Sequence, residues 1–238
     1  MIKRKESIEK GAGKKAAFRM RKRRKQMNRD LTVGEPQSVL WRFSIPMFVS
    51  VIFQQLYNMA DSVIAGKFAG EDALAAVGAS YPITMIFMAI AVGSNIGCSV
   101  IISQYFGAKW FEKMKTAVYT TLLSSTVLSV LLTFAGLLGS RWMMTAINTP
   151  ENIFADGDLY LRIYIGGFVF LFLYNVATGI FNSMGDSRTP LYFLIGSSLG
   201  NIVLDLIFVA VFHWVVAGVA WATFIAQGSA CVLALLAL

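Results

Sequence analysis

The sequence predicts an all-α, polytopic membrane protein with six transmembrane helices, and three observations support this fold class. Hydrophobic residues make up 56% of the 238 residues and charged residues only 14%, whereas a soluble domain usually carries about 25% charged residues. The segments without any Asp, Glu, Lys or Arg are long: 73–108, 116–140, 163–185 and 206–238. About 20 apolar residues cross the hydrocarbon, and these segments lack the polar face that a soluble helix presents to water.

The six helices follow from the apolar runs and from the charges and helix breakers between them. The expected ranges are 39–65, 73–107, 116–138, 159–182, 190–212 and 215–238. The second helix is about 50 Å long at 1.5 Å per residue, so it should tilt, bend or protrude from the bilayer. The connection 139–158 is the one long loop, and we expect it to hold a short interfacial helix.

A basic tail over residues 1–37 precedes the transmembrane lobe, which we expect over 38–238. Residues 1–35 contain 13 Lys or Arg and four acidic residues, a net charge of +9 (13 − 4), and the rest of the chain carries −1 (8 − 9). The basic cluster 19–25 has no interleaved aromatic residue and no recognisable nucleic-acid-binding module, so we expect no nucleic-acid partner. A cytosolic tail attracted to anionic membrane lipid is the favoured interpretation. Met27 is an alternative start of the chain.

The distribution of Lys and Arg predicts the orientation in a cell (inner) membrane. With the basic tail in the cytosol, the connection that holds Lys109, Lys113 and Lys115 and the turn that holds Arg188 also face the cytosol. The opposite connections carry three basic and five acidic residues: Lys67, Arg141, Arg162, Glu71, Asp72, Glu151, Asp156 and Asp158. Both ends of the chain are therefore expected in the cytosol.

Enzymatic and metal chemistry are not expected from this sequence. Cys98 and Cys231 lie inside apolar runs without a partner at metal-ligand spacing, so they are interpreted as small buried hydrophobic residues. The sole histidine, His213, stands beside Trp214 in a short break and is interpreted as an interfacial residue. No nucleophile–base pair or phosphate loop occurs, so we expect no cofactor other than a coupling ion.

Two carboxylates lie in or next to the apolar runs. Asp205 has 16 uncharged residues before it and 33 after it, and Asp61 ends the apolar run 43–60. A carboxylate at the centre of a transmembrane helix costs about 2.5–3.5 kcal/mol on insertion scales and is a functional candidate. For Asp61, a position at the headgroup level is the alternative.

Polar residues at helical spacing form four stripes, two of which contain a carboxylate. Residues three and four apart share a helix face, and the stripes defined in this way are Ser50, Gln54, Tyr57 and Asp61; Ser197, Asn201 and Asp205; Thr223 and Gln227; and Asn175, Thr178 and Asn182. Hydrogen bonding between membrane helices explains any single stripe, but it does not require ionisable groups. Asp205 lies about 10 Å below the outer end of its helix, and Thr223 has a matching depth. We therefore expect one outer cavity that binds a hard cation such as Na+ or contains a carboxylate that takes up a proton.

Several motifs in order resemble the multidrug and toxic compound extrusion (MATE) transporters of prokaryotic type. The stretches Ser44-Ile-Pro-Met-Phe, Gln54-Gln-Leu-Tyr-Asn-Met-Ala-Asp61-Ser and Gly66-Lys-Phe-Ala-Gly70 are similar to the opening of that family. The segment 179–190 resembles its connection between the fourth and fifth helices, and Asn201-Ile-Val-Leu-Asp205 resembles its Asn-x-x-x-Asp pair. The likeness covers residues 30–238.

The resemblance implies one six-helix lobe of a twelve-helix secondary antiporter that exports cationic or amphipathic drugs in exchange for H+ or Na+. The implied coupling-ion residues are Asp61, Asn201, Asp205 and Thr223, and Gln54, Tyr57 and Asn175 would line the substrate cavity. A flippase of lipid-linked sugars and a non-transporting membrane fragment are the alternatives.

One lobe alone is expected to be inactive, since the rocking of one lobe against another needs a partner. The partner would be a missing second half or a second copy of this chain. A shortened coding sequence is favoured because the last apolar run has no basic residue at its end.

Overall fold

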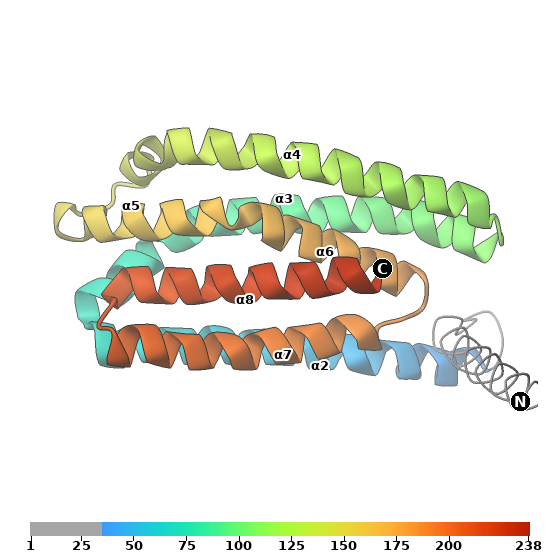
Figure 1. Cartoon of the computed structure of the whole chain (residues 1–238), viewed down its shortest axis with the longest axis horizontal. Helices are drawn as coiled ribbons and strands as arrows, with labels where there is room; N and C mark the ends of the chain where they lie inside the picture. The colour runs from blue at the N-terminus through green and yellow to red at the C-terminus, as the bar shows by residue number, and fades with distance from the viewer. Residues whose placement is uncertain (1–34) are drawn as a thin grey trace, which may run out of the picture.

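The computed structural model describes residues 35–238, except for the side chains at positions 36, 39, 42, 61, 65 and 69. The predicted basic tail thus lies almost entirely outside the described residues. The described part is all-α, with no strand between residues 35 and 238. Its helices run alongside one another in a single elongated bundle (Figure 1). The all-α prediction is confirmed.

The chain runs back and forth along the bundle, and α5 and α6 continue one another in a single pass (Figure 1). The elements in order are α2 (Pro36–Ile64), the π-helical η1 (Ala65–Ala69), α3 (Glu71–Gly107), α4 (Phe111–Ala146), α5 (Glu151–Gly166), α6 (Phe168–Ser183), α7 (Arg188–Asp205), the π-helical η2 (Leu206–Val211) and α8 (Val215–Ala237).

Four segments among the described residues are long and apolar enough to cross a membrane: α3, α4, the segment Arg188–Val211 and α8. The bent pair of α5 and α6 forms a fifth candidate if the two helices count as one span. The remaining predicted span falls on α2, whose 29 residues extend over about 43 Å. The polytopic membrane class is confirmed, and six as the number of spans stays a prediction.

The prediction of a long connection over residues 139–158 is wrong. Helix α4 continues to Ala146, and α5 begins at Glu151, so only residues 147–150 connect them. The prediction ended the third helix at residue 138, shortly before the charge of Arg141. A charged residue near the end of a membrane helix, however, extends into the headgroup region without breaking the helix. Pro150 precedes the first residue of α5, and Glu151 places a negative charge in its first turn, which favours a helix start.

The helix predicted over 159–182 is in fact two helices that bend by 47° between α5 and α6. Gly167 separates them, and its N–H lies 3.1 Å from the carbonyl oxygens of both Ile163 and Tyr164. Two adjacent glycines, Gly166 and Gly167, explain the bend, because sharp kinks without proline often occur at small residues.

The buried apolar side chains form one large cluster and smaller ones beside it. The large cluster joins α3, α4, α5 and α6 and includes Phe87, Phe168 and Phe172. Phe168 packs edge-to-face on both other rings, at centroid distances of 5.0 and 5.6 Å. Helices α2, α7 and α8 form a second group, with Ile64, Val209 and Val219 at its core near one end. Helix α8 lies between the two groups and contacts α5 and α6 as well as α7.

The turn between α6 and α7 fixes the start of α7. Gly185 has φ of 78°, a left-handed conformation that favours glycine. The Asp186 carboxylate accepts hydrogen bonds from the backbone N–H groups of Arg188 and Thr189, both at 3.1 Å. The Ser187 hydroxyl donates to the carbonyl oxygen of Phe43 at 3.0 Å and so ties this turn to α2.

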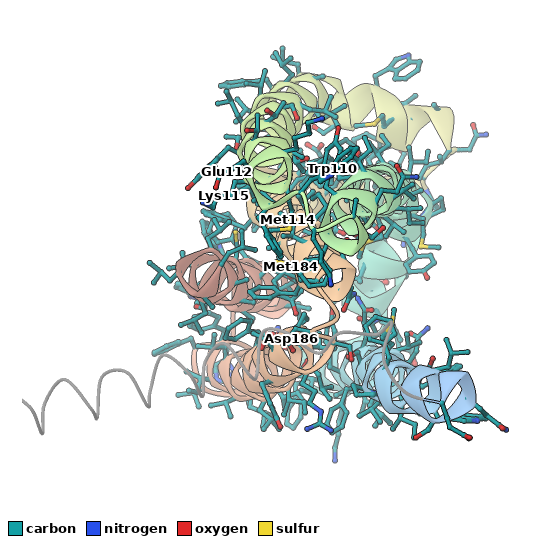
Figure 2. All side chains as sticks on the ribbon, turned by 90° about the vertical axis from the view of Figure 1, so that its right-hand side faces the viewer. Trp110, Glu112, Met114, Lys115, Met184 and Asp186 are labelled. Atoms are coloured by element: carbon teal, nitrogen blue, oxygen red, sulfur yellow. The ribbon has the colours of Figure 1, made fainter. Side chains whose placement is uncertain are left out.

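The same end of the bundle carries the turn between α3 and α4. Figure 2 shows Trp110 of that turn, Glu112 and Lys115 at the start of α4, and Asp186 of the α6–α7 turn on one end face. Lys115 and Glu112 form an exposed ion pair at 3.0 Å. Helix α8 also ends on this side (Figure 1).

A candidate ion site between helices α2, α7 and α8

The most buried polar side chains of α7 are Asp205 and Asn201. Asp205 is 0% exposed and Asn201 is 2% exposed. They are four residues apart, so they share one face of the helix. Asp205 is also the last residue before η2, and π-helical turns inside α-helices often occur at functional sites. A fully buried ionisable group inside a span is a functional candidate.

A small pocket opens beside this face of α7. It is lined by Tyr57 of α2, by Leu194, Ser197, Ser198 and Asn201 of α7, and by Thr223, Ala226 and Gln227 of α8. Its volume is about 10 Å³, close to the smallest cavity that holds one water molecule. Drug-sized ligands occupy pockets of about 300–1,000 Å³. The pocket within this lobe therefore matches a small ion or a water molecule.

The structure brings together three of the four residues predicted to bind the coupling ion. Asn201 and Thr223 line the pocket from α7 and α8, and Asp205 is buried one turn from Asn201. The backbone of Asp61 lies in α2, one turn from the pocket residue Tyr57. The side chain of Asp61 lies outside the described residues, so its place in the site stays a prediction.

Two of the three predicted substrate-cavity residues lie away from the pocket lining. Gln54 is half-buried on α2, one turn before Tyr57. Asn175 lies on α6, and its side-chain amide donates to the Leu171 carbonyl oxygen at 2.9 Å. Their predicted place in a substrate cavity that adjoins the ion site stays a prediction.

Ser198 was not among the predicted site residues. It is 5% exposed, it lines the pocket, and its hydroxyl has no hydrogen-bond partner among the described residues. Ser198, Asn201 and Asp205 follow the spacing i, i+3, i+7 and share a helix face. That spacing could have identified Ser198. The neighbouring Ser197 instead donates to the carbonyl oxygen of Leu194 on its own helix, at 3.0 Å.

A second polar region, between α3 and α6, has a different character. The Ser183 hydroxyl lies 3.0 Å from the Ser99 carbonyl oxygen and 2.7 Å from that of Gly179. Ser99 donates to Asn95 at 3.1 Å. A Cβ atom on Gly179 would collide with the side chains of Asn95 and Ser99. We call these four residues the α3–α6 seam. Small residues and paired hydroxyls are how membrane helices pack closely.

No group of three or more His, Cys, Asp or Glu side chains suitable for a metal ion occurs among the described residues. The site instead combines an ionisable carboxylate, an amide and hydroxyl groups inside a helical membrane bundle. This combination is typical of secondary transporters, which place coupling-ion sites within the membrane between helices.

The MatE family model matches residues 46–207, which is more than half of the chain. The chain belongs to the MATE family of transporters. The resemblance seen in the sequence is thus confirmed, including its correspondence to the N-terminal half of such a protein.

Relatives and a solved structure agree with this membership. The chain is 32% identical over 178 residues to the "Probable multidrug resistance protein YoeA" of Bacillus subtilis, covering 73% of this chain and 38% of that protein. It is 31% identical to YpnP of the same organism, another probable multidrug resistance protein, over 84% of this chain and 45% of that protein. A solved MOP-superfamily transporter from Pyrococcus furiosus superposes with a TM-score of 0.80 at 29% identity, covering 84% of this chain and 44% of that one. The chain therefore spans less than half the length of these relatives.

Proposed function

We propose that this chain is the N-terminal lobe of a secondary antiporter that exports cationic or amphipathic drugs in exchange for H+ or Na+. The observation that carries the proposal is the complete burial of Asp205 beside a pocket lined by Asn201 and Thr223. An ionisable side chain is expensive inside a bilayer, and packing alone does not require one.

The coupling ion would bind at Asp205 with Asn201, Thr223 and Asp61. A carboxylate together with amide and hydroxyl oxygens suits Na+, a hard cation. The same carboxylate could instead bind a proton. In both cases ion binding would rearrange the outer cavity and lower the affinity for substrate, and substrate would lower the affinity for the ion by the same factor.

The substrate would bind between this lobe and a second one. The pocket between α2, α7 and α8, at about 10 Å³, is too small for a drug, so we place the substrate cavity elsewhere, with one wall from each lobe. Gln54, Tyr57 and Asn175 would contribute to this lobe's side of it. The partner is a second six-helix lobe, either the other half of a longer transporter or a second copy of this chain. The purified chain alone, reconstituted in vesicles, should not move a fluorescent cation.

The proposed orientation in the cell membrane places both ends of the lobe in the cytosol. Lys109, Lys113, Lys115 and Arg188 belong to the α3–α4 turn and to the first turns of α4 and α7. These turns lie at the end of the bundle toward which α8 runs (Figure 1), and Lys and Arg favour the cytosolic side. Reporter fusions after Gly70 and Glu151 should be found outside the cytosol, and fusions after Lys113 and Asp186 inside. The inverted pattern would move the ion site to the cytosolic half.

Efflux from proteoliposomes tests the function directly. The lobe is reconstituted together with a C-terminal lobe from a MATE relative, and a fluorescent cation is followed under a Na+ gradient alone and under a pH gradient alone. Efflux under one gradient and not the other would identify the coupling ion. Movement of a lipid-linked sugar without cation efflux under either gradient would contradict the proposal and favour a flippase.

A further inference from the structure

The bend between α5 and α6 is filled by an aromatic ring from α8. A Cβ atom on Gly167 would lie 2.8 Å from Cδ2 of Phe224, closer than van der Waals contact allows. Gly167 is buried, so the ring rests directly on backbone that is free of a side chain. At a position where a ring approaches the chain so closely, any residue other than glycine would force the ring to shift.

Two further aromatic rings hold Phe224 in this position. Phe170 of α6 packs edge-to-face on it, with ring centroids 5.6 Å apart and an interplanar angle of 84°. Trp221, one turn earlier on α8, packs at 5.1 Å and 63°. Aromatic pairs in such geometries add about 0.5–1.5 kcal/mol beyond the area they bury. The ring is thus fixed from α6 and from its own helix.

Phe224 directly follows Thr223, which lines the pocket on another side of α8. Consecutive residues on an α-helix point about 100° apart. A rotation of α8 that withdrew Thr223 from α7 would therefore also displace the Phe224 ring from its contacts with Gly167 and Phe170. Helix α8 thus contacts the bend through Phe224 and the pocket through Thr223, and the two contacts move together if the helix is rigid.

We propose that Phe224 is a positioning residue: by seating its ring in the bend at Gly167, it fixes the rotation of α8 and holds Thr223 at the pocket. The importance of this position for transport rests on the proposed function, because it assumes that Thr223 binds the coupling ion. The geometric part can be tested without any ion.

The test measures how closely α8 faces α7. In the full chain with Cys98→Ser and Cys231→Ala, the substitutions Ser198→Cys and Thr223→Cys place two thiols at the same pocket, and their oxidative cross-linking rate is followed in detergent. Phe224→Ala should lower this rate by at least about fivefold, because small displacements strongly reduce reactions that depend on geometry. Melting temperature and gel-filtration profile show whether each variant is folded, and Phe224→Leu replaces Phe224→Ala if the latter is not.

Two comparisons separate positioning from general destabilisation. Ile225→Ala removes side-chain volume from the adjacent position of α8, where the side chain is 40% exposed, and it should leave the rate unchanged. Gly167→Ala should lower the rate in the presence of Phe224 but have little further effect in the Phe224→Ala background, because the ring that the new methyl group would meet is absent. An unchanged rate in Phe224→Ala, an equal loss in Ile225→Ala, or additive effects of Gly167→Ala and Phe224→Ala would overturn the proposal.

Binding of radioactive Na+ and uptake of protons are measured on the same Phe224 variants without the two pocket cysteines. Weaker binding of either ion in Phe224→Ala, with Ile225→Ala unchanged, is the expected result. If the parent chain binds neither ion, the proposed coupling site fails, whereas the cross-linking result still decides whether Phe224 positions α8.

Discussion

The α3–α6 seam and the α2–α7–α8 pocket both place polar groups inside the same apolar bundle, but they handle these groups in opposite ways. In the seam, the hydroxyls of Ser99 and Ser183 both donate hydrogen bonds, and Gly179 lets the two helices approach closely. In the pocket, the Ser198 hydroxyl has no partner among the described residues, and the neighbouring Asp205 is ionisable. The seam pairs its hydroxyls with groups of the same two helices, and the pocket region combines an ionisable carboxylate with one hydroxyl, that of Ser198, without a partner among the described residues.

Whether a buried polar group is ionisable or lacks a hydrogen-bond partner distinguishes functional residues from packing residues better than its polarity alone does. Hydroxyl and amide groups between membrane helices contribute on average about 0.6 kcal/mol each to stability. Burial of an ionisable carboxylate such as Asp205 costs free energy, and a buried hydroxyl without a partner, such as that of Ser198, reduces stability. Substitutions in the seam should therefore change stability and leave ion binding intact, and substitutions in the pocket should do the reverse.

The largest expected effect is that of Asp205→Asn. In an assembly with a second lobe, this change should abolish ion-driven efflux, because the amide keeps the shape of the side chain but cannot be ionised. The melting temperature should be equal to that of the parent or higher, since no carboxylate is then buried at this position. Efflux from proteoliposomes and thermal unfolding in detergent measure the two properties.

The Asp186→Asn variant is the matched control for charge removal, because Asp186 caps α7 at the opposite end of the same helix. It should lower stability slightly and keep the coupling. Full ion-driven exchange in Asp205→Asn would remove the distinction between the two polar regions.

Gly179→Ala should have the largest effect on stability. The added methyl group would collide with Asn95 and Ser99 across the seam, and such overpacking typically costs about 1–3 kcal/mol. Gly97→Ala on α3 is the control, because a Cβ atom there meets nothing within 4 Å. We expect a clear drop in melting temperature for Gly179→Ala and none for Gly97→Ala. The ion affinity of the folded fraction should stay unchanged. An equal drop in both variants would show that the seam is not closely packed.

A pair of serine substitutions compares the two regions at the level of one hydroxyl. Ser183→Ala should destabilise by about 1 kcal/mol, because Ser183 bonds to backbone carbonyl oxygens of α3 and α6. Ser198→Ala should leave the melting temperature unchanged or raise it, and lower the affinity for the coupling ion several-fold, about 1 kcal/mol. Ion titrations and melting curves of the two variants should show opposite patterns. Equal loss of stability in both would make Ser198 a packing residue.

Asn175→Ala should have the smallest effect on the lobe itself. Its amide bonds to the Leu171 carbonyl oxygen within the same helix, so the expected stability change is below about 1 kcal/mol. If Asn175 contacts substrate as predicted, the substrate affinity of the two-lobe assembly falls while the ion affinity stays the same. A loss of ion affinity instead would place Asn175 in the ion site.

The helical membrane class could be predicted well from the sequence, because charge-free runs and helix length depend on local composition alone. Prediction failed where a boundary depends on tertiary packing. The charge at Arg141 does not end α4, and the break at Gly167 lies inside a run without charges, where only the adjacent glycines indicated a bend. Nothing in local composition shows that Phe224, more than fifty residues away in the sequence, fills that bend.

For the site, helical spacing and depth are sufficient to associate Tyr57, Asn201 and Thr223 with one cavity, and all three line the pocket. The same reasoning overlooked Ser198, because the stripe was drawn through Ser197, whose hydroxyl bonds within its own helix. Both serines line the pocket, and spacing alone does not tell which of the two hydroxyls bonds within its own helix.

The three-residue connection between η2, which continues α7, and α8 has a consequence for how the lobe is made. Phe212, His213 and Trp214 join two apolar helices, and His213 adopts a left-handed φ of 56°. So short a link favours insertion of α7 and α8 into the bilayer as one hairpin. Asp205 and Thr223, 18 residues apart in the chain, would then enter the bilayer together. The carboxylate would thus have a polar side chain of α8 on the neighbouring helix as soon as it left the translocon. Tyr57, synthesised long before, would complete the pocket when the hairpin docks on α2.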